Sequence, residues 1–549
     1  MQLIKNYHFK KYTLSSEILI IILSVYFSIG FNHNFWQNLI TIQNQLLTNK
    51  FIFLSSMLLI VILLQLTILT LTSLIAWGKN ITKYIMVLLI TLTVVGDYFA
   101  KYYGVYFNRE MIANILHTNF SEAIELFNFS LILYYLKFGF FPSILIFFCL
   151  EIEKKSLIKH LTKKILLSGI YISMALLVIS SQFKAFCTII KNYKEIKYQL
   201  LPSSLLISSA RLLTAKHKTI KQPLISIDPN ASKLISSNSK TPTTVVLIVG
   251  ETVRANNWGL SGYSRQTTPE LAKLPIINFP YATSCGTNTD ISLPCMFSSY
   301  GRVNYNEEKI RSTESVLHLF NKMNIDVIWI DNQSGCKGVC DGLKYIEAKS
   351  LDTATTYCQK FGNCLDEILI TGLQQHLITN SSTQDQIIIL HQLGNHGPGY
   401  FARYPKEFNK FTPTCNSYDL TKCSNSEIIN AYDNAILYTD WFLAKIIKQL
   451  DTINTINHRK FLLIYVSDHG ESLGENNLYL HGMPYPIAPI EQKRVPMILW
   501  YSKNFPVNRQ RLLNKAKYPA HHDNLYHTLI KIFSIQSYTY NKELDLLND

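Results

Sequence analysis

A chain of 549 residues in which 48% are hydrophobic and only 16% are charged is too apolar for an ordinary soluble protein of this size. Its mean hydropathy of +0.10 indicates membrane segments. The formal net charge is +15, but the sequence has no zinc-finger spacing, no basic helix with heptads and no RNA-binding aromatic motif, so nucleic acid is not an expected partner. Anionic membrane lipid accounts for the charge more simply.

Five apolar runs in the N-terminal third are long enough, or nearly so, to cross a bilayer core of about 30 Å as helices. They lie at about 17–31, 51–77, 84–100, 128–150 and 165–182. The first could be a signal peptide, but no small-residue cleavage site follows it, which favours an uncleaved helix. Loops 1–16, 78–83 and 151–164 carry ten Lys residues, against three basic residues in the opposite loops. This asymmetry predicts a cytoplasmic N-terminus, and five crossings then place the chain after residue 182 outside.

The loop at 101–125 mixes aromatic and polar residues at helical spacing. It fits either an interfacial helix or a groove for a lipid headgroup, and the sequence does not separate the two. We expect a transmembrane domain over 1–182, a linker with a bridging helix over 183–240, and an outer domain over 241–549.

Strand and helix patterns alternate in the outer domain, which predicts an α/β fold with a mostly parallel central sheet and helices on both faces. The expected strands are Val245–Gly250, Asp326–Asp331, Gln386–His391, Phe461–Val466 and Pro496–Trp500. The expected helices include Thr313–Met323, Glu427–Leu450 and His522–Phe533.

Eight of the ten cysteines lie in the outer domain, in close pairs. Zinc binding by Cys336 and Cys340 is one alternative, but an oxidising compartment favours disulfides. Sequence alone does not determine connectivity, and bonds between neighbours are the simplest arrangement. The neighbouring pairs are Cys285–Cys295, Cys336–Cys340, Cys358–Cys364 and Cys415–Cys423.

Candidate metal ligands follow two of the expected strands. Asp468 and His469 come directly after Phe461–Val466 and Ser467, where open α/β sheets hold their ligands. A carboxylate and an imidazole both bind Zn²⁺. Glu251 follows the first strand and could share that metal, or it could serve with Thr252 at a helix N-terminus.

The loop between Cys285 and Cys295 is rich in hydroxyl groups. A bound metal lowers the pKa of a hydroxyl and makes it a nucleophile. Spacing alone leaves three candidates open, namely Thr287, Thr289 and Ser292.

Two histidines that precede glycine, His396 and His481, are candidates for binding phosphate or a second metal; the alternative is ordinary polar surface. Lys337, between two cysteines, could supply a positive charge to a phosphate, or it could be a solvated loop lysine.

Taken together, these motifs resemble the phosphoethanolamine–lipid A transferases, the polymyxin-resistance enzymes of the alkaline phosphatase and sulfatase superfamily. The resemblance covers essentially the whole chain: five helices, a linker and a hydrolase-like outer domain. The motifs that carry it are Val-Gly-Glu251-Thr-x-Arg-Ala, Cys-Gly-Thr-Asn-Thr289, Ser-Gly-Cys336-Lys-Gly-Val-Cys340, Asn-His396-Gly-Pro, Ser-Asp468-His469-Gly-Glu-Ser-Leu-Gly-Glu and Leu-His481-Gly.

The resemblance implies a role for each matching residue. It implies one tightly bound Zn²⁺ held by Glu251, Thr289, Asp468 and His469. Thr289 would be the nucleophile, and the eight paired cysteines would match family disulfides. Contacts to the phosphate, or to a second zinc, would come from His396 and His481. Substrate contacts would come from Lys337, from Gln333, where the family often has Asn, and, near the lipid entrance, from Asn108, Glu110, Asn114 and Thr118.

The resemblance also implies a multi-pass protein of the bacterial inner membrane with a periplasmic catalytic domain, which works as a monomer among membrane lipids. It would transfer phosphoethanolamine from phosphatidylethanolamine to a lipid A phosphate through a covalent threonine intermediate.

Three alternatives stay open. One is the same chemistry on another lipopolysaccharide or glycan acceptor, or with a phosphoglycerol group. Another is a membrane-anchored phosphatase or sulfatase, although Ser292-Leu-Pro294-Cys-Met296 lacks the Arg of a sulfatase motif. The third is a non-catalytic binding module, which the intact set of site residues argues against.

Overall fold

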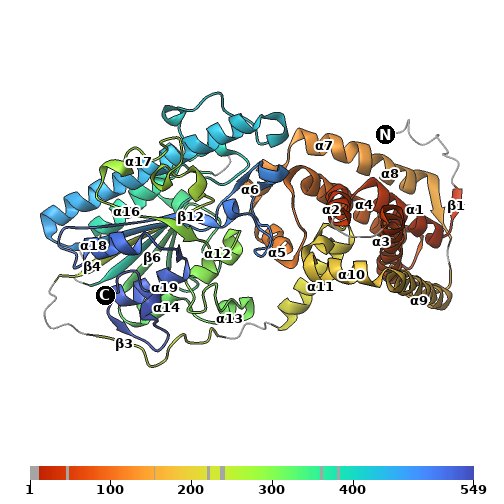
Figure 1. Cartoon of the computed structure of the whole chain (residues 1–549), viewed down its shortest axis with the longest axis horizontal. Helices are drawn as coiled ribbons and strands as arrows, with labels where there is room; N and C mark the ends of the chain where they lie inside the picture. Colours follow the sequence, from red (N-terminus) through yellow and green to blue (C-terminus); the bar gives the residue numbers. More distant parts are fainter. Residues whose placement is uncertain are drawn as a thin grey trace. The chain divides into compact units, whose positions relative to one another are not determined.

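The computed structural model describes residues 12–44, 49–153, 155–218, 223–234, 241–358, 363–379 and 384–548. These residues form two compact units (Figure 1). One unit contains the described chain up to Ile112 and again Phe127–Lys218. The other contains Ala113–Leu126 together with the chain from residue 219 onward.

The first unit is helical, and four of its described stretches are long and apolar enough to cross a membrane. They are Lys50–Ile75, Asn80–Tyr103, Phe129–Cys149 and Leu157–Ser181. Helices α1 (Ser16–Gly30) and α2 (His33–Gln43) meet at an angle of 62° and make a fifth span if they count as one. Asn32 between them has φ +69°, and a left-handed residue cannot continue a right-handed helix.

The helices of this unit comprise α3, α4, α7, α8 and α9, followed by α10 and α11. Their bounds are Lys50–Thr72, Lys79–Tyr103, Phe129–Tyr135, Phe141–Ile144, Leu157–Ser181, Phe183–Asn192 and Ser203–Lys218. Strands β1 (Tyr12–Leu14) and β2 (Leu150–Ile152) pair in parallel. The unit therefore extends through α11, past the boundary at residue 182 that the sequence suggested.

A buried polar network joins the start of α11 to the membrane helices. The Asn32 side chain accepts a hydrogen bond from the Leu201 amide (2.6 Å) and donates to its carbonyl (3.2 Å). Gln65 donates to the same carbonyl (2.7 Å) and accepts from Ser203 (2.9 Å). The Asn32 amide donates to Asp97 (2.9 Å). Each of these polar groups thus has a partner, as groups buried in an apolar surrounding require.

The second unit is built on an eight-stranded sheet with the order β13-β5-β12-β9-β4-β8-β6-β7. Its pairings are parallel except the two that β12 makes with β5 and β9. In chain order the strands are β4 (Thr243–Gly250), β5 (Ile277–Thr283), β6 (Asp326–Asp331), β7 (Lys344–Glu347), β8 (Gln386–His391), β9 (Lys460–Ser467), β12 (Arg494–Tyr501) and β13 (Ala520–His521). Two small antiparallel sheets are formed by β10 (Ser472–Leu473) with β11 (Tyr479–Leu480) and by β3 (Ser232–Lys233) with β14 (Ile535–Gln536).

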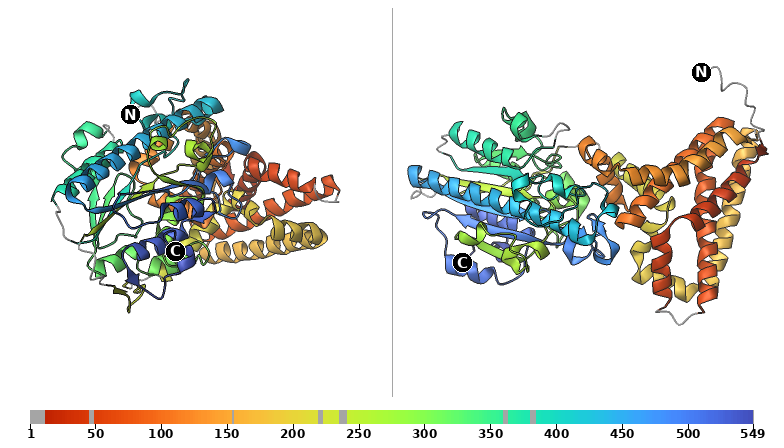
Figure 2. Two further views of the ribbon diagram at one scale, coloured as in Figure 1. Left: turned by 60° about the vertical axis from the view of Figure 1, so that its left-hand side comes forward. Right: turned by 90° about the horizontal axis from the view of Figure 1, so that it is seen from above.

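Helices cover both faces of the sheet, with α16 and α17 on one side and α14 and α19 on the other (Figures 1 and 2). Val245, Leu247 and Val249 of β4 point to the second face, where they share one buried cluster with Leu525 and Leu529 of α19. The helices of this unit are α5 (Arg109–His117, which begins in the first unit), α6 (Phe120–Leu126), α12 (Thr289–Met296), α13 (Glu307–Ser312), α14 (Val316–Lys322), α15 (Ala354–Tyr357), α16 (Glu367–Thr379), α17 (Asn425–Asn457), α18 (Arg509–Lys515) and α19 (Asp523–Ile532).

The predicted fold class is confirmed: a helical membrane domain and an α/β domain with a mostly parallel sheet. The five expected strands are β4, β6, β8, β9 and β12. Strands β5, β7 and β13 were not predicted. Pro280 lies inside β5, and β7 and β13 are short edge strands, so none of them shows a long apolar run.

The segment between the third and fourth apolar runs belongs to a different unit from the residues on either side of it in the sequence. Ala113–Leu126 lies inside the expected domain 1–182 but belongs to the unit that holds the sheet. Its His117 and Glu125 bond to outer residues Asp290 and Arg403. Polar contacts, which the hydropathy pattern does not show, therefore decide where this segment packs.

Candidate active site at the sheet edge

Strand register brings the two predicted carboxylates together. Strands β4 and β9 are adjacent and parallel, and Gly250 is opposite Ser467. The residues that follow, Glu251 and Asp468, therefore leave the sheet side by side at its carboxyl edge. This is the edge at which open α/β sheets bind their ligands.

Four side chains meet at this edge. The Thr289 hydroxyl lies 3.1 and 3.3 Å from the carboxylate oxygens of Glu251 and 3.4 Å from Nε2 of His469. That Nε2 lies 3.3 Å from Glu251 Oε1 and 3.2 Å from Asp468 Oδ2. All four side chains are buried. The predicted ligand set is thus one contiguous cluster.

The charge of this cluster is not balanced within it. Asp468 Oδ1 accepts from the amides of Thr252 (3.1 Å) and His469 (2.7 Å), but Oδ2 is buried and has no hydrogen-bond partner among the described residues. Burial, and then the neighbouring charge of Asp468, raises the pKa of the Glu251 carboxyl well above its ordinary value. One ligand atom each from Glu251, Asp468 and His469 lies within 4.8 Å of the others. A divalent cation suits such a donor set.

Thr289 is the first residue of α12, and Asn288 caps this helix by accepting a hydrogen bond from the Ile291 amide at 3.0 Å. A disulfide between Cys285 and Cys295 spans the loop and the helix. Because a helix N-terminus favours negative charge, this position stabilises a threonine oxygen that loses its proton.

The structure distinguishes the three hydroxyl candidates by their partners. Thr287 donates to the Met483 carbonyl (2.6 Å), and Ser292 donates to the Asp468 carbonyl. Both hydroxyls therefore donate hydrogen bonds to backbone carbonyls. Of the three, the Thr289 hydroxyl is the one that lies among the cluster side chains.

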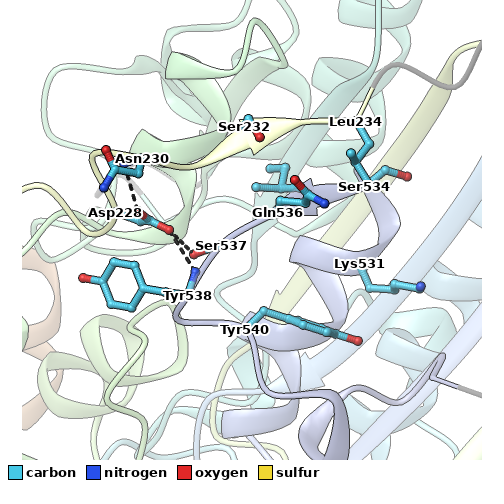
Figure 3. Close-up of a pocket in the computed structure, with 11 residues that line it drawn as sticks. Asp228, Asn230, Ser232, Leu234, Lys531, Ser534, Gln536, Ser537, Tyr538 and Tyr540 are labelled. Carbon is cyan, nitrogen blue, oxygen red and sulfur yellow. Dashed lines mark hydrogen bonds between the residues drawn. The ribbon is translucent and has the colours of Figure 1, made fainter.

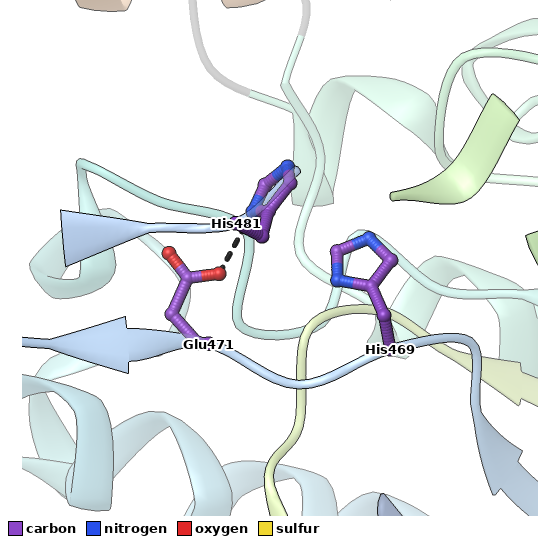
Figure 4. A group of neighbouring side chains, drawn as sticks. All are labelled: His469, Glu471 and His481. Carbon is purple, nitrogen blue, oxygen red and sulfur yellow. Dashed lines mark hydrogen bonds and ion pairs between the residues drawn. The ribbon is translucent and has the colours of Figure 1, made fainter. Parts of the chain in front are cut away.

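A second group of potential ligands adjoins the first and shares His469 with it. His481 Nδ1 lies 2.8 Å from Glu471 Oε2 (Figure 4), and Glu471 Oε1 accepts from the Tyr400 hydroxyl at 2.8 Å. The rings of His469 and His481 are 4.4 Å apart and those of His396 and His481 are 5.6 Å apart. Burial, and then the neighbouring His481, lowers the pKa of His396 well below its ordinary value. Both predicted loop histidines thus lie beside the cluster.

Lys337 has a left-handed backbone, with φ +51°, inside the loop that the Cys336–Cys340 disulfide closes. Its Nζ donates to Ser334 Oγ (2.8 Å) and to the Ser334 carbonyl (3.0 Å). The Gln333 side chain also bonds to Ser334. A non-glycine residue in this conformation is uncommon and is often found at functional sites.

The residues predicted to lie near the lipid entrance fall on both units. Asn108 and Glu110 belong to the first unit, where Asn108 caps the start of α5 by accepting from the Met111 amide at 2.9 Å. Asn114 and Thr118 belong to the second unit, and Thr118 donates to the Asn114 carbonyl at 2.8 Å. Their contacts with lipid stay a prediction.

Sequence reasoning missed Glu122, on the same segment. Burial raises the pKa of its carboxyl, while the Lys337 charge and a hydrogen bond from Ser334 oppose that rise. Glu122 therefore lies close to the predicted substrate lysine. Its spacing of four residues from Thr118, which is itself four from Asn114, is the available signal in the sequence, although the structure interrupts the helix between His117 and Phe120.

Two buried histidines behind the site were also missed. His391 Nδ1 lies 2.7 Å from Asp331, at the adjacent ends of β8 and β6. His522 Nδ1 accepts from the Cys285 amide (3.1 Å), and its Nε2 donates to the Ser467 carbonyl (2.9 Å). His522 therefore ties the nucleophile loop to the strand that carries Asp468. A polar residue that ends an apolar strand was the available signal for His391, and none marked His522.

Four disulfides join neighbouring cysteines in the outer unit: Cys285–Cys295, Cys336–Cys340, Cys358–Cys364 and Cys415–Cys423. Cys149 and Cys187 are free.

A separate surface cavity of about 580 Å³ lies beside β3 and β14 (Figure 3). Its most acidic group, Asp228, accepts from the Ser537 hydroxyl (2.7 Å) and the Tyr538 amide (3.0 Å). None of the described residues that line it belongs to the predicted site.

Comparison with known proteins agrees with this geometry. Residues 243–535 match the family described as Sulfatase, and residues 62–217 match the family described as Phosphoethanolamine transferase EptA/EptB. The chain is 37% identical over 465 residues to Phosphoethanolamine transferase EptA of Escherichia coli K12, with 82% of each chain covered. It is 34% identical over 477 residues to Phosphatidylethanolamine transferase Mcr-1 of Escherichia coli, which covers 85% of this chain and 86% of that one.

The chain is also similar to a solved structure, the integral membrane lipooligosaccharide phosphoethanolamine transferase A of Neisseria meningitidis. It superposes with a TM-score of 0.90 at 33% identity, covering 97% of this chain and 98% of that one. Fold and site thus define a membrane-anchored enzyme of the alkaline phosphatase and sulfatase class. Within that class, the chain belongs to the phosphoethanolamine transferase family, as its motifs predicted.

Proposed function

We propose that this chain moves phosphoethanolamine from phosphatidylethanolamine to a lipid A phosphate in two steps, with Thr289 as the temporary carrier and Zn²⁺ as the cofactor. The observation that carries the proposal is the Thr289 hydroxyl, 3.1 Å from Glu251 and 3.4 Å from His469 in a buried acidic cluster. The hydroxyl thus bonds to side chains of the cluster, whereas those of Thr287 and Ser292 bond to backbone carbonyls.

The donor set fits a zinc ion. Asp468 Oδ2 is buried and accepts no hydrogen bond from the described residues, and it lies beside a second buried carboxylate and the His469 imidazole. Glu251, Thr289, Asp468 and His469 would hold the ion. When bound, it lowers the pKa of the threonine hydroxyl and offsets negative charge on the phosphoryl oxygens.

In the first step the Thr289 oxygen gives up its proton and attacks phosphorus, and the bond from phosphorus to the diacylglycerol oxygen breaks. The diacylglycerol oxygen takes up one proton, so that diacylglycerol leaves as an alcohol and phosphoethanolamine stays on Thr289. The N-terminus of α12 stabilises charge on the attacking oxygen. Glu471 holds His481 by its Nδ1, which leaves the other ring nitrogen for the substrate. Lys337 supplies positive charge to the phosphate.

In the second step an oxygen of the lipid A phosphate attacks the phosphorus, the bond from phosphorus to the Thr289 oxygen breaks, and that oxygen takes up the proton that the lipid A phosphate releases. Several relatives are named for phosphoethanolamine transfer, which supports the transferred group. The added amine reduces the negative charge of lipid A, and weaker attraction of cationic peptides such as polymyxin follows from that change. We place the protein as a monomer in the bacterial inner membrane, with its N-terminus in the cytoplasm and the sheet unit in the periplasm.

One specific observation favours a second candidate for the acceptor. The chain is also 32% identical over 300 residues to the Kdo(2)-lipid A phosphoethanolamine 7''-transferase of Escherichia coli K12, covering 52% of this chain. That name implies a sugar hydroxyl as acceptor in place of a phosphate. The longer matches, to EptA and Mcr-1, carry no sugar position in their names, and we keep the lipid A phosphate as the proposed acceptor.

Mass spectrometry of lipopolysaccharide from cells that express the chain tests the proposal. We expect lipid A to gain phosphoethanolamine with the wild-type chain and with Thr287→Ser, and to gain none with Thr289→Ala. Thr287→Ser is the matched control because that hydroxyl bonds to the Met483 carbonyl. Modified lipid A with Thr289→Ala would rule out this nucleophile, and an added group on the core sugars alone would rule out lipid A as acceptor.

A further inference from the structure

Glu125 and Arg403 form a buried ion pair whose two members come from distant parts of the chain. Their side chains are 5% and 1% exposed, and Arg403 Nη2 donates to Glu125 Oε2. The other carboxylate oxygen, Oε1, accepts from Asn363 Nδ2 at 2.7 Å. Glu125 lies on α6, on the segment between two membrane spans, whereas Arg403 follows the His396 loop.

Arg403 also holds that loop directly. Its Nε donates to the His396 carbonyl at 2.7 Å, while its Nη1 is buried and has no hydrogen-bond partner among the described residues. The guanidinium therefore makes one bond to the backbone of a candidate catalytic residue and one to Glu125. A planar guanidinium that makes two directed bonds fixes the position of both partners.

The other end of the loop contacts the candidate ligand cluster. The Asn395 amide donates to the Glu251 carbonyl at 2.9 Å. At Gly394, with φ +54°, an added Cβ would lie 2.7 Å from the same carbonyl. His396 is thus held between Glu251 on one side and Arg403 on the other. The start of the loop is held further by Asp366, which accepts from the amides of Leu393 (2.8 Å) and Gly394 (2.9 Å), so the Arg403 bond adds the anchor at His396 itself.

We propose that Glu125 and Arg403 are positioning residues for phosphoethanolamine transfer, through which segment 113–126 completes the catalytic site of the sheet unit. The Glu125 carboxylate orients the Arg403 guanidinium, and the guanidinium orients the His396 loop toward the transferring phosphate. This inference rests on the proposed function. Neither residue touches the substrate, so the pair acts on the rate of transfer and hardly on lipid affinity.

A buried pair such as this one could instead be purely structural, and charge removal separates the two roles. Glu125→Gln leaves the Arg403 charge buried without its partner, which destabilises the fold whichever role is right. The double variant Glu125→Leu with Arg403→Met removes both charges and restores the balance, but it also removes the bond to the His396 carbonyl.

The experiment uses the full chain with zinc, reconstituted in vesicles that contain phosphatidylethanolamine. It measures the rate of adduct formation on Thr289 by intact mass, the KM for the lipid, the zinc content and the apparent Tm. Glu270→Gln with Lys273→Met is the matched control because that pair is at the surface, with 32% and 66% of its side chains exposed.

We expect Glu125→Gln to slow adduct formation roughly 10- to 100-fold with little change in KM or zinc content. The double variant should regain the wild-type Tm and stay slow, and the control pair should match the wild type throughout. A double variant that regains both Tm and rate, or Glu125→Gln at the wild-type rate, overturns the positioning role alone. A wild-type chain that forms no Thr289 adduct overturns the proposed function, and this inference with it.

Discussion

The candidate site draws on two regions that differ in how they are built. The ligand cluster is made by adjacent strand ends, where register alone sets Glu251 beside Asp468. Segment 113–126 is a pair of short helical stretches between two membrane spans, and it reaches the same site through the side chains of His117, Glu122 and Glu125.

The two regions have different tasks: the ligand cluster carries out the reaction, and the segment positions residues for it. The sheet holds its residues through many backbone bonds, so the cluster exists once the sheet has formed. The segment relies on a few side-chain contacts, which are individually replaceable. We therefore expect changes in the cluster to abolish the reaction and changes in the segment to slow it.

The largest effect is expected for Asp468→Asn. It removes a carboxylate whose Oδ2 is buried and accepts no hydrogen bond from the described residues, so zinc content should fall and adduct formation should drop roughly 1000-fold or more. The metal-free variant should nevertheless melt at a higher temperature than metal-free wild type, because the repulsion between Asp468 and Glu251 is gone. Metal analysis measures the zinc content, intact mass measures the adduct, and thermal melts measure the melting temperature. A variant with full zinc content would contradict this account of the cluster.

A smaller effect on the Thr289 adduct rate is expected for His522→Gln, because His522 connects the cluster to the nucleophile loop. Burial lowers the pKa of His522 to about 4, although its hydrogen bond to the Ser467 carbonyl acts in the opposite direction. The unfolded chain has the ordinary pKa of about 6.5, so below that pH it binds a proton that the folded chain does not. The free energy of unfolding should thus fall by about 3 kcal/mol as the pH drops from about 6.5 to 4.

His522→Gln should flatten this loss of apparent Tm between neutral pH and about pH 5. His527 is the matched comparison because its pKa is also lowered to about 4, by burial, and its Nδ1 accepts from the Asn541 amide at 3.0 Å. His527→Gln should flatten the acid dependence similarly while leaving the Thr289 adduct rate unchanged. Equal loss of rate in both variants would show that His522 has no special link to the nucleophile loop.

The smallest effect is expected for His117→Gln, on the segment. His117 Nδ1 lies 2.9 Å from Asp290, the residue after the nucleophile, but its side chain is 40% exposed. Arg311 holds the same carboxylate at 2.7 Å. An exposed contact with such a second partner contributes less than about 1 kcal/mol, so the adduct rate should fall about fivefold at most. A fall as large as that for Asp468→Asn would place His117 in the reaction itself.

The two regions also differ in how far the sequence could predict them. Asp468, His469 and Glu251 each follow a long apolar run, so their strands and their shared edge could be inferred. Thr289 could only be narrowed to three hydroxyls by spacing, because the partners of Thr287 and Ser292 are backbone carbonyls far away in the sequence. Only the resemblance to a family distinguished them.

The segment could not be placed by pattern. Hydropathy assigned it to the membrane domain, since its neighbours on both sides are apolar runs. Its actual partners Asp290 and Arg403 lie more than a hundred residues downstream, and a carboxylate such as Glu125 carries no mark of which arginine it will meet. Contacts of this kind are decided by tertiary packing alone.

The separation of 278 residues between Glu125 and Arg403 bears on how the protein is made. At typical synthesis rates of about 5–20 residues per second, the arginine emerges roughly 15 to 55 s after the carboxylate. Throughout that interval the segment is tethered between two spans while the unit it belongs to is still being translated. The Glu125 carboxylate therefore has to wait for Arg403, and a ribosome that stalls before Arg403 leaves the segment without this partner.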